Sequence, residues 1–161
     1  MKKILMSIAL VGTMCSTLSA QGTLKNKDKQ LNIGLGMSNY GLPVYAGLDF
    51  GVGNDITFGL EGSINFWNNY KHSHSDLGLG INGNYHFNRI LELPQKMDLY
   101  AGLNLGFRFH LGNYESHDYS GLGFGGQLGF RYFFTNTVAF QIEANGGNAV
   151  SGGKLGFTFK L

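Results

Sequence analysis

Cysteine and proline are scarce in this sequence, with one Cys and two Pro among 161 residues. The one cysteine, Cys15, lies in an apolar N-terminal run, and Met14 before it makes a poor site for lipid attachment. Removal of that run leaves no cysteine, which excludes a disulfide framework and thiolate-based metal or redox chemistry.

Net charge is also close to zero. The chain has 12 basic and 10 acidic residues, and two of the basic ones, Lys2 and Lys3, stand at the N-terminus. Without those two, acidic and basic residues are equal in number. A neutral chain lacks the basic patch that a nucleic-acid-binding domain needs, so nucleic acid is not an expected partner.

The N-terminal residues have the parts of a secretory signal peptide. Two lysines precede the apolar run Ile4–Cys15, and small and polar residues follow as far as Ala20. This order is typical of a signal peptide, and the run is too short for a transmembrane helix. We therefore predict a signal peptide over residues 1–20, a flexible polar lead-in over 21–30, and one domain over 31–161.

Glycine and phenylalanine are abundant, with 26 Gly and 13 Phe, and the stretch Met97–Leu111 shows how they are used. Its odd positions from Leu99 to Leu111 are all apolar, whereas its even positions are small, polar or charged apart from Tyr100. A period of two indicates an extended strand with two different faces. This strand is long enough, when tilted, to cross a bilayer, as the strands of a transmembrane barrel do.

The same alternation recurs along the chain and predicts eight strands. Sheet edges left open in lipid would have unsatisfied backbone groups, so the strands must close into a barrel. The predicted fold is an all-β, eight-stranded antiparallel up-and-down transmembrane β-barrel. The strands are expected at 31–38, 44–52, 56–66, 77–87, 97–111, 122–134, 138–145 and 154–161.

The predicted connections alternate between the two ends of the barrel. Outer-membrane barrels have short periplasmic turns and longer outer loops, which orients the chain. The periplasmic connections are expected at Gly53–Asp55, Arg89–Lys96 and Thr135–Thr137. The outer connections are expected at Asn39–Pro43, Asn68–Ser75, Gly112–Ser120 and Gly146–Gly153.

Charged residues occur on the predicted inward face. An eight-stranded barrel is just wide enough for its own side chains to fill, so these charges are expected to form a structural polar network, with a narrow gated channel as the alternative. Arg131 and Glu143, on neighbouring strands, are expected to pair, because an isolated ion there would be costly. The predicted interior charge network is Asp49, Glu61, Arg108, Arg131, Glu143 and Lys160.

Other polar clusters are weaker candidates. The run from Lys71 to Asp76 and the run from His117 to Ser120 have the residue types of a metal site or a hydrolase triad, but hydrophilic residues are also the rule in outer loops. The glycines Gly121, Gly123 and Gly126 match a dinucleotide-binding motif, which needs a helix after the strand and here has none predicted. No catalytic residue, metal ligand or cofactor is assigned.

The C-terminal residues carry a family resemblance. The last predicted strand contains Lys154, Gly156, Phe159 and the terminal Leu161. This pattern resembles the C-terminal insertion signal of bacterial outer-membrane barrels, in which an aromatic residue is commoner at the terminal position. The mature chain looks like the small OmpA/OmpX-type barrels. The resemblance implies a Gram-negative outer-membrane location, insertion by the barrel-assembly machinery, contact with outer-membrane lipid and lipopolysaccharide, and a monomer.

The resemblance leaves several functions open. The first is a non-enzymatic barrel that has a structural role or presents its loops at the cell surface. The second is a lipid A-modifying hydrolase, because some eight-stranded barrels deacylate lipid A with a Ser/His/acid set, although the outward strand faces here have no such set. A narrow gated channel is the third, and a wide porin disagrees with the strand number.

Overall fold

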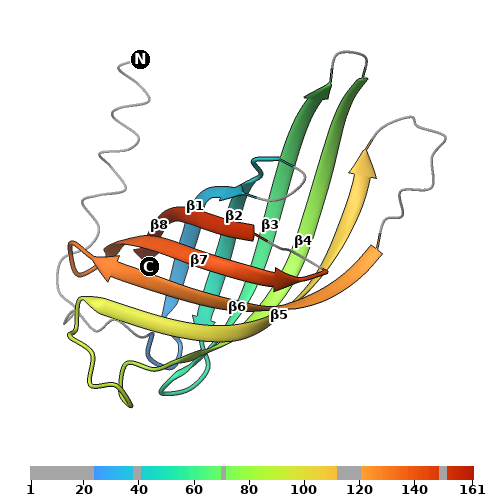
Figure 1. The fold of residues 1–161 in the computed structure, drawn as a ribbon. Coiled ribbons are helices and arrows are strands. Elements are labelled where there is room, and N and C mark those ends of the chain that lie inside the picture. The colour runs from blue at the N-terminus through green and yellow to red at the C-terminus, as the bar shows by residue number, and fades with distance from the viewer. Residues whose placement is uncertain (1–23, 38–40, 70–71, 112–120, 149–151) are drawn as a thin grey trace, which may run out of the picture.

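The predicted barrel is confirmed in a computed structural model, which describes residues 24–37, 41–69, 72–111, 121–148 and 152–161. Eight antiparallel strands form a closed barrel in which each strand pairs with its neighbours in the chain and β1 pairs with β8 (Figure 1). Among the described residues, no helix has the length and apolar character needed to cross a bilayer. The strands are β1 (Lys29–Met37), β2 (Val44–Gly51), β3 (Ile56–Asn69), β4 (His72–His86), β5 (Met97–Leu111), β6 (Gly121–Phe133), β7 (Val138–Gly147) and β8 (Gly152–Lys160).

The seam between β1 and β8 closes the barrel. Its register runs from Gln30 opposite Lys160 to Met37 opposite Gly153. Gly34 and Gly156 face each other in this seam, and a Cβ atom at Gly34 would lie 2.1 Å from the Leu155 carbonyl oxygen. Glycine at this pair therefore allows the two backbones to approach and leaves no open sheet edge at the seam.

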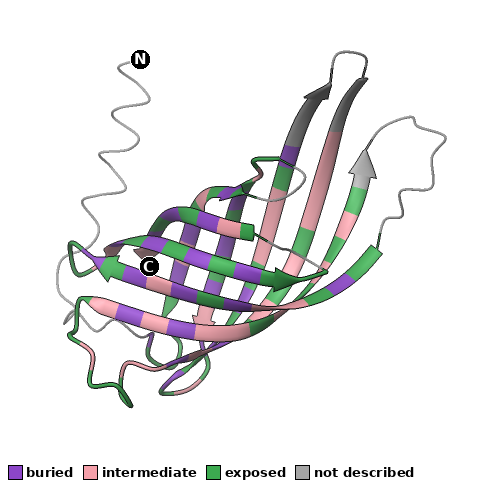
Figure 2. Cartoon of the chain, in the orientation of Figure 1, coloured by how far each residue is buried: buried purple, intermediate pink, exposed green. Residues whose placement is uncertain are grey.

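The two faces of the wall have opposite chemistry. Figure 2 shows buried and exposed residues alternating along the strands. On β5, Tyr100 is fully buried in the interior, whereas Leu103 on the outer face is 76% exposed. The buried residues are mostly polar, and large exposed apolar residues occur on all eight strands. A soluble protein rarely exposes so large an apolar surface, whereas a membrane barrel needs one for contact with lipid.

The barrel wall is much taller on one side. Strands β3, β4, β5 and β6 have 14, 15, 15 and 13 residues, whereas β1, β2, β7 and β8 have 8 to 10. In Figure 1, β3 and β4 extend well beyond the strands on the opposite wall. The predicted outer loop Asn68–Ser75 was therefore wrong, because β3 and β4 remain paired up to Asn69 opposite His72. Backbone pairing does not require the apolar alternation that predicted the shorter strands.

Other boundaries also differ from the prediction. Strand β1 begins at Lys29, two residues before the predicted start at residue 31, and Leu24 in the predicted lead-in is buried. The Lys25 carbonyl passes close to Gly51, where a side chain would not fit. The predicted loop Gly146–Gly153 was too long, since β7 extends to Gly147 and β8 begins at Gly152. The predicted signal peptide and the loop Gly112–Ser120 lie outside the described residues.

Candidate functional site in the barrel interior

Arg131 is the centre of the first of two buried charge clusters. Its guanidinium lies 2.9 Å from an oxygen of Asp49 and 3.2 Å from an oxygen of Asp98, and its Nε donates to Gln141 at 3.1 Å. Both carboxylates and the guanidinium are almost completely buried. Asp49 is on β2 and Arg131 on β6, which are opposite strands of an eight-stranded ring. This ion pair therefore crosses the lumen.

The predicted pairing of Arg131 with Glu143 was wrong. The register places Arg131 opposite Gln141, and Glu143 opposite Gly129. The ring of Tyr100 lies against Gly129, where a Cβ atom would be 2.1 Å from the ring, and the guanidinium stacks over that ring at 4.2 Å. The Tyr100 hydroxyl donates to Glu143 at 2.7 Å. Tyr100 thus separates the two charges that were expected to pair.

Lys154 is the centre of the second cluster. Its ammonium donates to both oxygens of Glu61, at 2.6 and 2.7 Å, and lies 3.1 Å from Glu143. Asn145 also donates to Glu143, at 3.1 Å. The three ammonium hydrogens are therefore matched by three carboxylate contacts. Lys154, Glu61 and Glu143 together carry one more negative than positive charge.

Further hydrogen bonds extend the first cluster around the barrel wall. Gln30 and Asn32 on β1 donate to Asp49 at 2.8 and 2.9 Å. His86 on β4 lies 2.7 Å from Asp98 through Nδ1 and 3.1 Å from the Thr57 hydroxyl through Nε2. Residues from seven strands, β1 to β7, therefore form the first cluster, as is needed where water cannot solvate the buried charges.

The six predicted network residues do not form one network. Asp49 and Arg131 belong to the first cluster, and Glu61 and Glu143 to the second. Lys160 lies near the periplasmic end, with its ammonium 4.4 Å from the Phe133 ring centre. Arg108 is half-buried towards the outer end of β5.

Four important interior residues were not assigned to the network: His86, Asp98, Tyr100 and Lys154. Strand parity alone placed the first three on the inner face. Asp98 contacts His86 on the preceding strand and Arg131 on the following one, whereas the Tyr100 hydroxyl reaches Glu143 on β7. Lys154 was assigned to the insertion signal, which the structure does not test, and its position on β8 also directs it inward to Glu61, 93 residues earlier in the chain. Sequence spacing contains no signal for such a contact.

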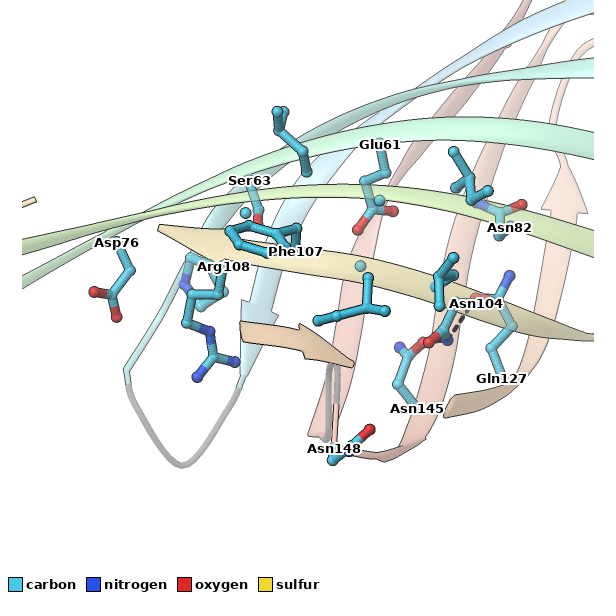
Figure 3. A pocket seen from close by; sticks show the side chains of 18 of the residues that line it. Glu61, Ser63, Asp76, Asn82, Asn104, Phe107, Arg108, Gln127, Asn145 and Asn148 are labelled. Carbon is cyan, nitrogen blue, oxygen red and sulfur yellow. Dashed lines mark hydrogen bonds between the residues drawn. The ribbon is translucent and has the colours of Figure 1, made fainter. Parts of the chain in front are cut away.

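A cavity of about 190 Å³ with both polar and apolar lining residues lies towards the outer end of the barrel (Figure 3). Glu61 and its partner Lys154 are among the lining residues. In Figure 3, Asp76 and Arg108 lie at one end of the cavity and Asn82 and Gln127 at the other, with Glu61 between them. Glycines from β4, β5 and β6 form much of its wall and leave space where other residues would place side chains. Its polar lining also includes Ser63, Asn82, Asn104, Gln127, Asn145 and Asn148.

The periplasmic end is closed differently. Leu24, Phe133 and Ala139 are the buried apolar residues in this part of the barrel, each at most 2% exposed. Below them, the turn residue Arg89 pairs with Asp55, and the hydrogen bond to that carboxylate raises the pKa of the Arg89 guanidinium. Along the barrel, the interior thus has three buried apolar residues near one end, then two charge clusters, and then the outer cavity.

Two of the alternative chemical motifs lie within strands, and the third lies outside the described residues. Among the described residues, no group of three or more His, Cys, Asp or Glu side chains is placed to hold a metal ion. The residues from His72 to Asp76 belong to β4 instead of a loop, and Gly121, Gly123 and Gly126 lie within β6, with no helix following them in the described chain. The run His117–Ser120 lies outside the described residues.

Comparison with known proteins identifies the fold. The chain is similar to the outer membrane protein OprG from Pseudomonas aeruginosa, with 10% identity over 88% of this chain and 99% of that one, and a TM-score of 0.63. It is also similar to the Yersinia pestis outer membrane protein Ail, with 10% identity over 84% and 100% of the two chains and a TM-score of 0.56. No family model matches the sequence, and no curated protein matches it significantly.

A designed protein is among the similar structures. A de novo transmembrane β-barrel has 18% identity over 86% of this chain and 98% of that one, with a TM-score of 0.54. Its similarity shows that this architecture alone specifies no natural activity. The chain has the fold of these eight-stranded outer-membrane barrels, and its apolar outer face is suited to contact with lipid.

Proposed function

We propose that this outer-membrane barrel is a closed, non-enzymatic anchor that presents its outer hairpin and loops at the cell surface. The observation that carries the proposal is the Arg131–Asp49 ion pair, which joins opposite walls across the lumen. Above it, Lys154 joins β8 to Glu61 on β3. Two such cross-links in a barrel of eight strands leave no continuous water-filled path for solutes.

The tall wall supports the second half of the proposal. Strands β3 and β4 are paired to Asn69 and His72, far beyond the last β1–β2 pair. A strand-paired hairpin that extends past the rest of the wall suits contact with lipopolysaccharide or with another surface molecule. The barrel itself then acts as a monomeric anchor, inserted by the assembly machinery through its last strand.

Conductance in planar bilayers tests the closed interior. The wild-type barrel should give no discrete conductance steps. A matched pair of variants makes the test specific: Gly80→Leu adds a side chain on the inner face of β4, whereas Gly83→Leu adds one on its outer face. A wild-type conductance that Gly80→Leu reduces and Gly83→Leu leaves unchanged would show a channel and contradict the proposal.

Shortening the hairpin tests the surface role. Removal of the cross-strand partners Asn68, Asn69, His72 and Ser73 keeps the register of the remaining pairs. The shortened barrel should keep its folded gel mobility and its size as a monomer in detergent, and lose association with lipopolysaccharide vesicles. Equal association of both proteins would contradict a role for the hairpin. An unchanged lipid A mass spectrum, with and without the folded protein, is the expected result for a non-enzymatic barrel.

A further inference from the structure

The outer cavity has the features of a binding site that the anchoring role does not need. Gly78, Gly80 and Gly106 are inward-facing positions of β4 and β5 that line it. A Cβ atom at Gly80 would meet nothing closer than the Leu105 carbonyl oxygen at 3.4 Å, so this glycine is not forced by packing. Glycine in a strand interior weakens the strand and is often found where a ligand approaches the backbone closely.

The inner part of the cavity is lined by carboxamides with unused hydrogen-bonding capacity. Asn104 donates to Gln127 at 3.1 Å and to Asn145 at a longer 3.5 Å. The Asn104 side-chain oxygen is buried and accepts no hydrogen bond from the described residues. A buried acceptor without a donor costs free energy, which a ligand hydroxyl or an ordered water would recover. Carboxamides both donate and accept, as hydroxyl groups do.

The charges beside the cavity disfavour an anionic ligand. All three hydrogens of the Lys154 ammonium already contact Glu61 and Glu143. An anion at the inner end would therefore face two carboxylates without a free cation to bind it. At the rim, Asp76 and Arg108 supply one charge of each sign. The inner lining is thus polar, rich in amides, and without a cationic group that could bind an acid.

The size of the cavity limits the ligand to one small ring. An apolar protein cavity of about 150 Å³ binds a benzene molecule. The present cavity, at about 190 Å³, can hold one six-membered ring with its polar substituents. We propose that the outer cavity binds a small, uncharged, hydroxyl-rich molecule, of the size and chemistry of a monosaccharide. The proposal goes beyond the anchoring role and needs only the outer cavity, whether or not the barrel conducts ions.

Nuclear magnetic resonance titration of the intact barrel tests the proposal directly. The probes are the methyl glycosides of glucose, galactose and N-acetylglucosamine, added to labelled protein in a phosphocholine detergent, which has no sugar head group to compete. The side-chain amide signals of Asn104 and Gln127 should shift and saturate with at least one probe. A ligand of about 12 heavy atoms with ordinary efficiency gives a Kd on the order of 1 mM.

Matched variants decide whether the cavity is the site. Gly80→Leu should fill the space and weaken binding at least about tenfold, whereas Gly83→Leu, where a Cβ meets no atom within 4 Å, should leave the Kd unchanged. Asn104→Leu should also weaken binding, and it keeps the test decisive if Gly80→Leu fails to fold. Binding that both Gly80→Leu and Asn104→Leu leave intact would overturn the proposal.

Charged sugars distinguish the alternatives. Glucuronate should bind more weakly than the neutral probes, since it brings a carboxylate towards Glu61. Saturable binding of glucosamine alone would identify a cation site and overturn the proposal. Chemical shifts that never saturate would show that the cavity holds only water, and would overturn it too. Binding by a barrel that also conducts ions would refute the closed interior and leave the sugar site standing. The two proposals can therefore fail separately.

Discussion

Replacement of Arg131 by methionine is the sharpest test of how the interior is stabilised. Methionine keeps much of the side-chain length and removes the charge. Asp49 and Asp98, both at most 3% exposed, would then lose their shared cation. Loss of one partner from a buried ion pair costs about 3–5 kcal/mol of unfolding free energy. Two charge-assisted hydrogen bonds at about 1.5–3 kcal/mol each give a similar value.

Urea unfolding in lipid vesicles, followed by gel mobility of the folded barrel, measures this loss. The matched control is Arg89→Met, which removes the same charge from a side chain that is 71% exposed in its pair with Asp55. Water already solvates the exposed Arg89 guanidinium, although Asp55 is buried, so the control should lose clearly less unfolding free energy than Arg131→Met does. Equal effects of the two variants, or a loss below about 1 kcal/mol for Arg131→Met, would refute the argument from burial.

A rescue experiment separates charge from packing. Replacement of a whole buried ionic group by neutral residues of similar size is often close to neutral in free energy. Addition of Asp49→Asn and Asp98→Asn to Arg131→Met should therefore recover most of the lost stability. If the triple variant is as unstable as Arg131→Met alone, the lost contact between the guanidinium and the Tyr100 ring, at 4.2 Å, is the larger contribution.

Three further predictions concern glycine, β8 and the C-terminus. Gly129→Ala should lower the unfolding free energy by about 1–3 kcal/mol, because its Cβ would clash with the Tyr100 ring, whereas Gly146→Ala, with nothing within 4 Å, should not change it. Lys154→Met should lower the unfolding free energy of the barrel even when it refolds in vesicles without assembly machinery, because it removes the cation between Glu61 and Glu143. A wild-type unfolding free energy would show that Lys154 acts in insertion alone. Leu161→Phe should raise the yield of inserted barrel in a Gram-negative host, and an equal yield on membrane fractionation would contradict the importance of a terminal aromatic residue.

The amino-acid sequence by itself determined the strand number, the closed barrel and the side of the wall that each residue faces. Each strand faces lipid on one side and packed polar groups on the other, so apolar residues recur at every second position. This period is a local property that can be read directly from the sequence. The period also placed Asp98 and Tyr100 inside correctly. It failed at Asn68–Ser75, where no apolar alternation marks the strand although the backbone pairing of β3 and β4 continues.

The tertiary structure alone decided which charges meet. Arg131 was expected to pair with Glu143 on the next strand, yet its partner Asp49 is 82 residues away on the opposite wall. Lys154 similarly reaches Glu61 across 93 residues. Neighbouring strands still supply partners, because Asp98 and Gln141 lie directly opposite Arg131 in the register. A long side chain in a narrow closed barrel can, however, also reach a strand on the far wall. The register, and the ring of Tyr100 over Gly129, decide between them.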